Sequence, residues 1–170
     1  MVGEQRRYRY VGPAEVAAVA LRGGGPGWPV RSADDFAGWV ASVGGRELAE
    51  PFTYVVDPAG VLRLAARRSE HVACAGGGEV LAAGEIAFVA GPRGWSVGEV
   101  SNQSTGYCPD PGCWPAVAAA LDRAGLAHPG GFTAEFVFRR CPRCGQLSVV
   151  KDGDFVCHVC DADLPRSWNL

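Results

Sequence analysis

Residues 52–64 read FTYVVDPAGVLRL, and this stretch gives the clearest indication of the fold. Two runs rich in aromatic and β-branched residues, 52–56 and 61–64, flank the turn-forming residues at 57–60. Runs of this kind on either side of a short turn predict a β-hairpin. We therefore expect antiparallel pairing of neighbouring strands to be the basis of the fold.

The strand pattern continues downstream of this hairpin. Three further strands are predicted, at residues 79–83, 86–90 and 95–100. Helices are expected before and after the strands, at residues 14–21, after the N-cap Ser32, and at 114–121. Because strands and helices do not alternate regularly, the sequence predicts an α+β fold with a mainly antiparallel sheet and a few short helices.

Four of the seven cysteines form two pairs near the C-terminus, Cys141 with Cys144 and Cys157 with Cys160. Each pair has the C-x2-C spacing that is typical of metal ligands. Four thiolates close a tetrahedron around zinc and leave no open coordination position, so we expect a structural Zn²⁺ site. A rubredoxin-like iron site is the alternative, because a tetrathiolate site suits both metals.

The segment between the two pairs predicts a second hairpin, with a turn at residues 152–154 between two apolar runs. With this hairpin and the four cysteines, residues 139–165 resemble the zinc ribbon family. The first turn, Cys-Pro-Arg-Cys-Gly at 141–145, matches the knuckle of that family closely, whereas Asp161 stands in the second turn where glycine is common. The resemblance implies structural zinc and a docking surface for a protein or a nucleic acid.

The position of the ribbon predicts two parts of the chain. Residues 1–138 are expected to form the α+β body, and residues 139–170 the zinc ribbon. A predicted strand at 132–138 runs directly into the first cysteine pair. We therefore expect the ribbon to be docked on the body and not held on a loose linker.

Charge and hydropathy restrict the classes of partner and the compartment. The formal net charge is −2, which argues against nucleic-acid binding and leaves a nucleic-acid adaptor as the least favoured hypothesis. No apolar run approaches the roughly 20 residues needed to span a bilayer. Residues 1–8 lack the apolar core of a secretory signal, and metal-type cysteine pairs fit a reducing compartment, so a cytoplasmic protein is expected. One lysine against fifteen arginines is typical of a bacterial genome rich in GC.

Two polar segments interrupt the predicted strands, at residues 67–79 and 101–113. The second is long for a connection, and long structured loops are commonly functional. We therefore predict a binding or regulatory protein whose partner, another protein or a small polar ligand, contacts these segments. The candidate binding residues are Arg67, Arg68, Asn102, Gln103 and Ser104.

An enzyme acting on a nucleotide or an ADP-ribose-like substrate is the alternative. In that hypothesis His71 is the acid or base, Glu85 orients it, and Tyr107 stacks on the substrate or hydrogen-bonds to it. However, the glycines at 76–78 are not followed by a helical pattern, so they lack the context of a phosphate-binding loop. The binding protein is therefore preferred to the enzyme.

Three cysteines remain outside the metal-type pairs. With His71 they would form a second metal site, but the spacing between two of them is poor for a metal-binding turn. Buried thiols behave as small apolar groups, which is the preferred interpretation. These cysteines are Cys74, Cys108 and Cys113.

Overall fold

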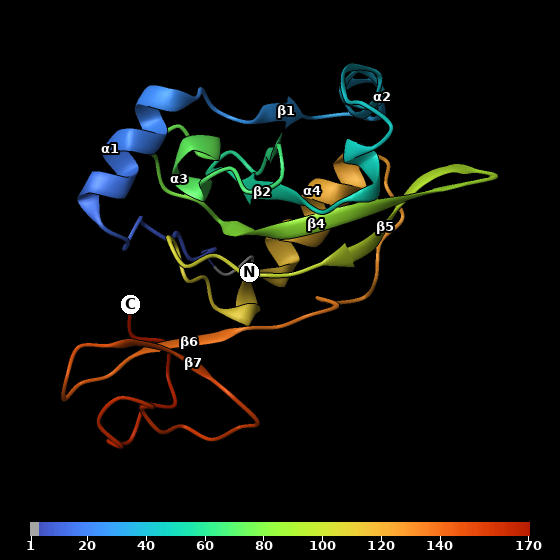
Figure 1. Cartoon of the computed structure of the whole chain (residues 1–170). Coiled ribbons are helices and arrows are strands. Elements are labelled where there is room, and N and C mark those ends of the chain that lie inside the picture. Colours follow the sequence, from blue (N-terminus) through green and yellow to red (C-terminus); the bar gives the residue numbers. More distant parts are fainter. Residues whose placement is uncertain (1–3) are drawn as a thin grey trace.

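The computed structural model describes residues 4–170, so the first three residues of the N-terminal segment considered above lie outside the described part. A five-stranded antiparallel sheet forms the centre of the body (Figure 1). Its strands, in spatial order, are β1 (Trp28–Val30), β3 (Leu62–Ala65), β2 (Phe52–Val56), β4 (Ala82–Gly91) and β5 (Gly94–Val100). Every neighbouring pair is antiparallel, which confirms the predicted α+β fold.

The predicted hairpin is β2–β3, with Val56 opposite Leu62. The carboxylate of Asp57 organises its turn, because Oδ1 accepts hydrogen bonds from the backbone N–H groups of Ala59 and Val61 at 2.9 and 3.0 Å. The other carboxylate oxygen accepts from Arg63 Nε at 2.9 Å. An aspartate that hydrogen-bonds to the backbone after it is a turn-forming device, so the turn residues fix the register of this hairpin.

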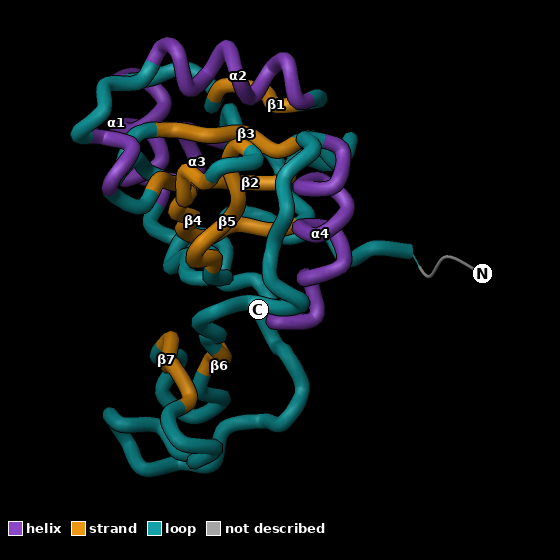
Figure 2. The backbone as a smooth tube through the Cα atoms, turned by 90° about the vertical axis from the view of Figure 1, so that its right-hand side faces the viewer, coloured by secondary structure: helices purple, strands orange, loops and turns teal. Residues whose placement is uncertain are grey.

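Helices cover both faces of the sheet. They are α1 (Ala14–Gly23), α2 (Ala33–Ser42), α3 (His71–Cys74) and α4 (Trp114–Arg123), with short 3₁₀ turns η1 (Glu47–Ala49) and η2 (Pro111–Cys113). Figure 2 shows α1 and α3 on one side of the sheet and α4 on the other. The predicted cap of α2 is confirmed, because Ser32 Oγ accepts a hydrogen bond from the Asp35 N–H at 3.1 Å.

The core of the body is aromatic at one end of the sheet. Trp39 of α2 lies edge-on to Phe52 with ring centroids 4.7 Å apart, and Phe36 contacts Phe88 at 5.0 Å. On the α4 side, Val117 and Leu121 are fully buried. Among the helices within residues 4–170, none is long and apolar enough to cross a membrane.

One expectation about local structure is wrong. The two separate strands predicted at 79–83 and 86–90 are replaced by one strand, β4, which starts at Ala82 and continues through Gly84, while Val80 forms an isolated bridge with Tyr8. A Cβ at Gly84 would collide with the carbonyl group of Ser101, so the glycine allows a close backbone approach. His71, in the polar segment at 67–79, begins the one-turn helix α3.

The C-terminal region contains β6 (Val137–Arg140) and β7 (Leu147–Val150), which pair antiparallel. The turn predicted at 152–154 forms, with Asp152 and Gly153 both at positive φ. However, β7 pairs with β6, the strand that precedes the first cysteine pair, and not with residues 155–157. A small separate cluster of buried residues packs behind this hairpin: Cys141, Cys157 and Leu164.

The tail that follows the second cysteine pair returns to the hairpin. Arg139 of β6 is 5% exposed, and its guanidinium donates to the carbonyl oxygens of Pro165 and Arg166 at 3.0 and 2.7 Å. The Asn169 side chain exchanges two hydrogen bonds with the backbone of Arg140. Because of these contacts, the tail lies beside β6 (Figure 1).

The same tail also contacts the body. Trp168 donates from Nε1 to the Cys108 carbonyl oxygen at 2.8 Å and lies edge-on to Tyr8, with ring centroids 5.3 Å apart. The guanidinium of Arg6 lies 4.8 Å from the centroid of the Trp168 ring. The C-terminal hairpin is therefore attached to the body at two places, at the start of β6, where Phe136 hydrogen-bonds to Asn102, and through Trp168.

Candidate functional site

The four predicted metal ligands come together at the end of the C-terminal hairpin. Their sulfurs all lie within 4.8 Å of one another, with Cys141 3.5 Å from Cys160 and Cys144 3.7 Å from Cys157. A zinc ion about 2.3 Å from four tetrahedral sulfurs requires sulfur–sulfur distances of about 3.8 Å. The cluster therefore has the size of a tetrathiolate metal site.

Two equivalent turns present these sulfurs. The Gly145 N–H donates to the Cys141 carbonyl at 2.9 Å, and the Asp161 N–H donates to the Cys157 carbonyl at 2.9 Å. Gly145 has φ of 75° and Asp161 has φ of 58°. Both turns therefore bend through a left-handed residue that directs the two sulfurs of each pair to one side.

The environment of the sulfurs favours thiolates that share a cation. The backbone N–H of Val159 lowers the pKa of the Cys157 thiol to about 6. For Cys160, the Ala162 N–H lowers the pKa, but burial and the three other sulfurs outweigh this effect and raise it to about 12. Negative charge on one sulfur thus opposes ionisation of the next. A bound cation removes this conflict, because metal ligation deprotonates thiols outright.

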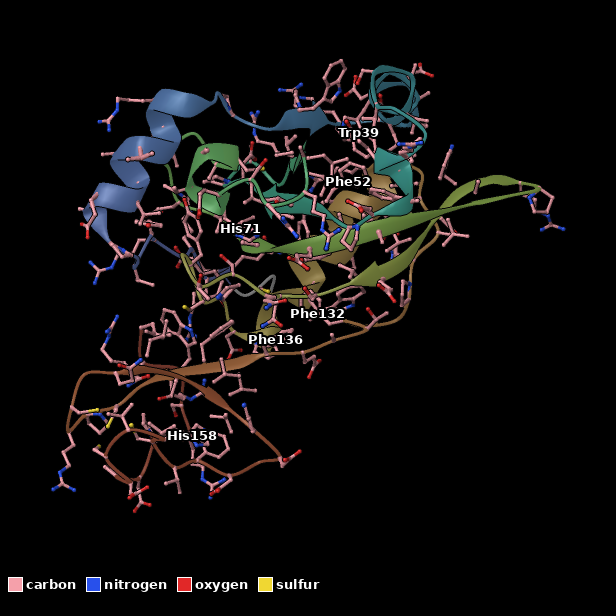
Figure 3. All side chains as sticks on the ribbon, viewed as in Figure 1. Trp39, Phe52, His71, Phe132, Phe136 and His158 are labelled. Atoms are coloured by element: carbon pink, nitrogen blue, oxygen red, sulfur yellow. The ribbon has the colours of Figure 1, made fainter. Side chains whose placement is uncertain are left out.

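The four ligands differ in their access to solvent. Cys141 and Cys157 are buried, whereas Cys144 is exposed. The Ser148 hydroxyl lies 3.9 Å from the Cys157 sulfur, behind the cluster. His158 is exposed in the C-terminal region and does not belong to the group of clustered cysteines (Figure 3).

A concavity with several polar side chains in its walls lies on the body, over β4 and β5, and we call it the β4–β5 cleft. Its volume is about 240 Å³. Its polar walls come from Glu85, Glu99, Ser101, Gln103 and Thr133, and its apolar walls include Pro51, Ala87 and Phe136. The cleft lies on the same face of the sheet as α3. That helix covers β2 and β3, whereas β4 and β5 form the floor of the cleft.

Strand register explains why these residues share one face. Thr53 lies opposite Glu85 across β2 and β4, and Ala87 lies opposite Glu99 across β4 and β5. Side chains of paired residues point to the same side of a sheet. Glu85 and Glu99 are therefore diagonal neighbours, and both are exposed.

The loop at 101–113 is held by buried polar side chains. Asn102 is fully buried, and its Nδ2 donates to the carbonyl oxygens of Pro109 and Phe136 at 2.9 and 2.8 Å. Its Oδ1 accepts from the Phe136 N–H at 2.7 Å. Ser104 Oγ accepts from the Tyr107 N–H. Two predicted ligand-binding residues, Asn102 and Ser104, thus order the loop, and Gln103 between them is exposed and lines the cleft.

The three candidate catalytic residues occupy different environments. Glu85 lines the β4–β5 cleft, whereas neither His71 nor Tyr107 belongs to its walls. The Nε2 atom of His71 lies 2.9 Å from the Gly84 carbonyl oxygen, and burial lowers the pKa of this histidine (Figure 3). Tyr107 is fully buried and donates to the Gly78 carbonyl at 2.7 Å. This last bond joins the two polar segments, 67–79 and 101–113.

The two candidate arginines lie away from the cleft. Arg67 forms an ion pair with Glu50 at 3.0 Å, and both side chains are about half exposed. Arg68 is exposed and has φ of 67°. Sequence reasoning missed Glu99, Thr133 and Phe136, which line the cleft. The alternation of residues along β5 was the one signal for Glu99, since it places Glu99 and Ser101 on one face.

The three remaining cysteines are buried in the body. Burial raises the pKa of each of them, Cys74, Cys108 and Cys113, to about 12. Cys74 donates to the Arg63 carbonyl at 3.6 Å, and Cys108 donates to the Thr105 carbonyl at 3.4 Å. They are therefore protonated at neutral pH and serve as packing groups.

Comparison with protein-family models, with curated proteins and with solved structures found no match to this chain. The cysteine cluster and the β4–β5 cleft are therefore the features of this chain that indicate a function.

Proposed function

We propose that this chain is a cytoplasmic zinc-ribbon binding protein, in which a structural Zn²⁺ stabilises the C-terminal module and the body binds a small polar ligand. The observation that carries the metal assignment is the group of four cysteine sulfurs within 4.8 Å of one another. With all four positions supplied by thiolates, the ion has no site for water or substrate, which is typical of structural zinc. Thiolate ligands also fit a reducing compartment better than an oxidising one, where cysteines tend to form disulfides.

In this proposal residues 139–170 are a module docked on the body of residues 1–138. The support is the double attachment through β6 and through Trp168, which donates to the Cys108 carbonyl. Cys108 belongs to the predicted binding loop at 101–113. Metal binding would therefore order the tail that packs against this loop, since metal binding is coupled to folding in small modules of this kind.

The ligand site is proposed at the β4–β5 cleft. The support is the contrast within the start of the loop, where Asn102 and Ser104 are buried and fixed by hydrogen bonds and Gln103 is exposed in the cleft. A rigid scaffold that presents a few polar groups in a hollow is the usual form of a small-molecule site. The enzyme hypothesis lacks comparable support, because His71 Nε2 and the Tyr107 hydroxyl contact backbone carbonyls.

Two measurements test this proposal. Elemental analysis of the purified protein should give one zinc per chain and a colourless solution, whereas a red protein with one iron would replace zinc by a rubredoxin-like site. A fragment screen followed by amide chemical shifts should move the signals of residues 99–103 and 133–136. If fragments shift only amides elsewhere in the chain, the cleft is not the ligand site.

A further inference from the structure

We propose that the β4–β5 cleft binds a cationic group, an ammonium or guanidinium at the end of an alkyl chain, between the carboxylates of Glu85 and Glu99. This inference rests on the proposed ligand site and names the chemical class of its ligand.

The first argument is the charge of the cleft walls. Glu85 and Glu99 are diagonal neighbours on adjacent strands, so both carboxylates present negative charge on the same side of the sheet, in the walls of the cleft. The ion pairs among residues 4–170 join Arg63 to Asp57, Arg67 to Glu50 and His128 to Asp122, and none of them includes either glutamate. Within residues 4–170, neither carboxylate therefore has a counter-charge in an ion pair.

His71 does not supply that charge either. It is close enough to Glu85 for the carboxylate to raise its pKa, but burial is the larger effect and lowers the pKa of the imidazole below its ordinary value. The imidazole is thus neutral at pH 7. Polar groups that conflict locally in a folded protein are expected at functional sites, where a ligand resolves the conflict.

The second argument is the nature of the other walls. Phe136 is half-buried and offers an aromatic ring, which attracts cations through the negative charge of its face. Pro51 and Ala87 provide apolar surface suited to a methylene chain. Gln103 adds an exposed amide whose oxygen can accept a hydrogen bond. The walls thus combine what an alkyl chain with a terminal cation requires.

The third argument is the rigidity of the backbone below the two carboxylates. Ser101 Oγ accepts from the Glu85 N–H at 3.3 Å and from the Gln103 N–H at 3.2 Å. The Ser101 carbonyl accepts from the buried Tyr54 hydroxyl at 2.8 Å. One residue thus fixes the backbone on both sides of the cleft. A site held in place before binding loses less conformational entropy when the ligand arrives.

The volume and the negative charge of the cleft favour a compact cation over the nucleotides of the enzyme hypothesis. About 240 Å³ lies below the roughly 300–1,000 Å³ typical of sites for drug-sized ligands. Two carboxylates also repel phosphate. A compact cation fits both properties, and it can come from a free amine or guanidine or from a lysine or arginine side chain of a peptide.

Calorimetric titration of the full-length, metal-loaded protein at low salt tests the proposal. The probes are agmatine, a blocked arginine (Ac-Arg-NH₂) and the blocked citrulline of the same shape, which replaces the guanidinium by a neutral urea. We expect at least one of the two cationic probes to bind, and the citrulline probe to bind at least about tenfold more weakly, about 1.4 kcal/mol. Tighter binding of agmatine indicates a small-molecule ligand, and tighter binding of the blocked arginine indicates a peptide.

Variants locate the site. Glu85→Gln and Glu99→Gln keep the shape of exposed side chains, and each should weaken binding about tenfold. Glu15→Gln, an exposed glutamate of α1 outside the cleft, is the matched control and should leave the affinity unchanged. Equal binding of the arginine and citrulline probes, or equal affinities in all three variants, would overturn the assignment of a cation. If fragments bind in the cleft without preference for charge, the cationic ligand is overturned but the proposed ligand site stands. If no probe and no fragment binds there, both the cationic ligand and the ligand site are overturned.

Discussion

Asp161 occupies the same left-handed backbone position in the second cysteine turn that Gly145 occupies in the first. Each donates its N–H to the carbonyl of the cysteine four residues earlier, at 2.9 Å. Glycine adopts this conformation without steric cost, and aspartate is one of the few other residues that do so readily. The second turn therefore differs from the zinc-ribbon pattern in the residue at this position, but its backbone has the same conformation.

This equivalence predicts opposite effects for two substitutions. Asp161→Gly removes the residual strain and should leave metal retention unchanged or slightly improved. Asp161→Val places a β-branched side chain at a φ of 58° and should destabilise the ribbon by about 1–2 kcal/mol. Competition with a chromogenic chelator measures the loss. Asp163→Val, at an exposed position outside the left-handed region, is the control, and an equal loss there would contradict the backbone explanation.

Removal of the metal should loosen the ribbon and its tail while the central sheet stays folded. The small cluster of Cys141, Cys157 and Leu164 is separate from the main core, so its loss does not open the body. Hydrogen exchange after chelation should therefore accelerate in residues 137–169 and stay slow in β2 and β4. Uniform acceleration over the whole chain would show that the two cores unfold together.

Substitution of Arg139, a buried cation, should strongly reduce the free energy of unfolding. Its guanidinium donates to three backbone carbonyls, those of Phe138, Pro165 and Arg166. Arg139→Met leaves these acceptors without their donor and should cost at least about 2 kcal/mol of unfolding free energy. Chemical denaturation measures it. Arg93→Met, at the exposed tip between β4 and β5, is the matched control and should change stability by less than about 0.5 kcal/mol.

Asn102 and Gln103 form a matched pair for separating structure from binding. Asn102→Ala removes three hydrogen bonds from a fully buried site and should cost at least about 2 kcal/mol. Gln103→Ala changes an exposed residue of the cleft, so it should leave stability within about 0.5 kcal/mol and weaken ligand binding. Thermal denaturation and the titration described above measure the two effects. A Gln103→Ala variant that unfolds as easily as Asn102→Ala would place Gln103 among the structural residues.

His128 predicts a dependence of stability on pH. The Pro129 carbonyl and then the Asp122 carboxylate, 2.8 Å from Nε2, raise the pKa of this histidine. A raised pKa means that the folded state binds the proton more tightly, so the stabilisation is complete below about pH 6.5 and is lost as pH rises through the folded pKa. Urea denaturation should show a larger difference between the wild type and His128→Gln at pH 5.5 than at pH 8.5. An equal difference at the two pH values would contradict this role of His128.

Local signals in the sequence predicted the parts of the fold that local chemistry determines. The turn residues before Val61 fixed the β2–β3 hairpin, and Ser32 marked the start of α2. The cysteine spacing identified the metal cluster for the same reason, since two residues between ligands allow one tight turn. In each case a single short segment contains the interactions that decide the structure.

The parts that sequence reasoning missed depend on pairing between distant segments. The cleft needs Glu99 beside Glu85, which follows from a strand register that shifts at Ala87 and Phe88. β7 pairs with β6 and not with residues 155–157. The turn residues at 152–154 do not indicate which of these two segments pairs with β7. The alternative enzyme hypothesis placed Tyr107 against a substrate, and the sequence did not indicate that its hydroxyl donates to the carbonyl of Gly78, 29 residues away.

The bond from Trp168 to the Cys108 carbonyl joins positions 60 residues apart, and the chain between them passes through the metal site. Closing so large a loop in one step is entropically unfavourable and slow. Coordination of the sulfurs divides this long loop into smaller ones and brings the tail close to its contact with the body. The proposed zinc should therefore act on the folding pathway as well as on the final state, with refolding in chelator giving a late, slow phase in Trp168 fluorescence.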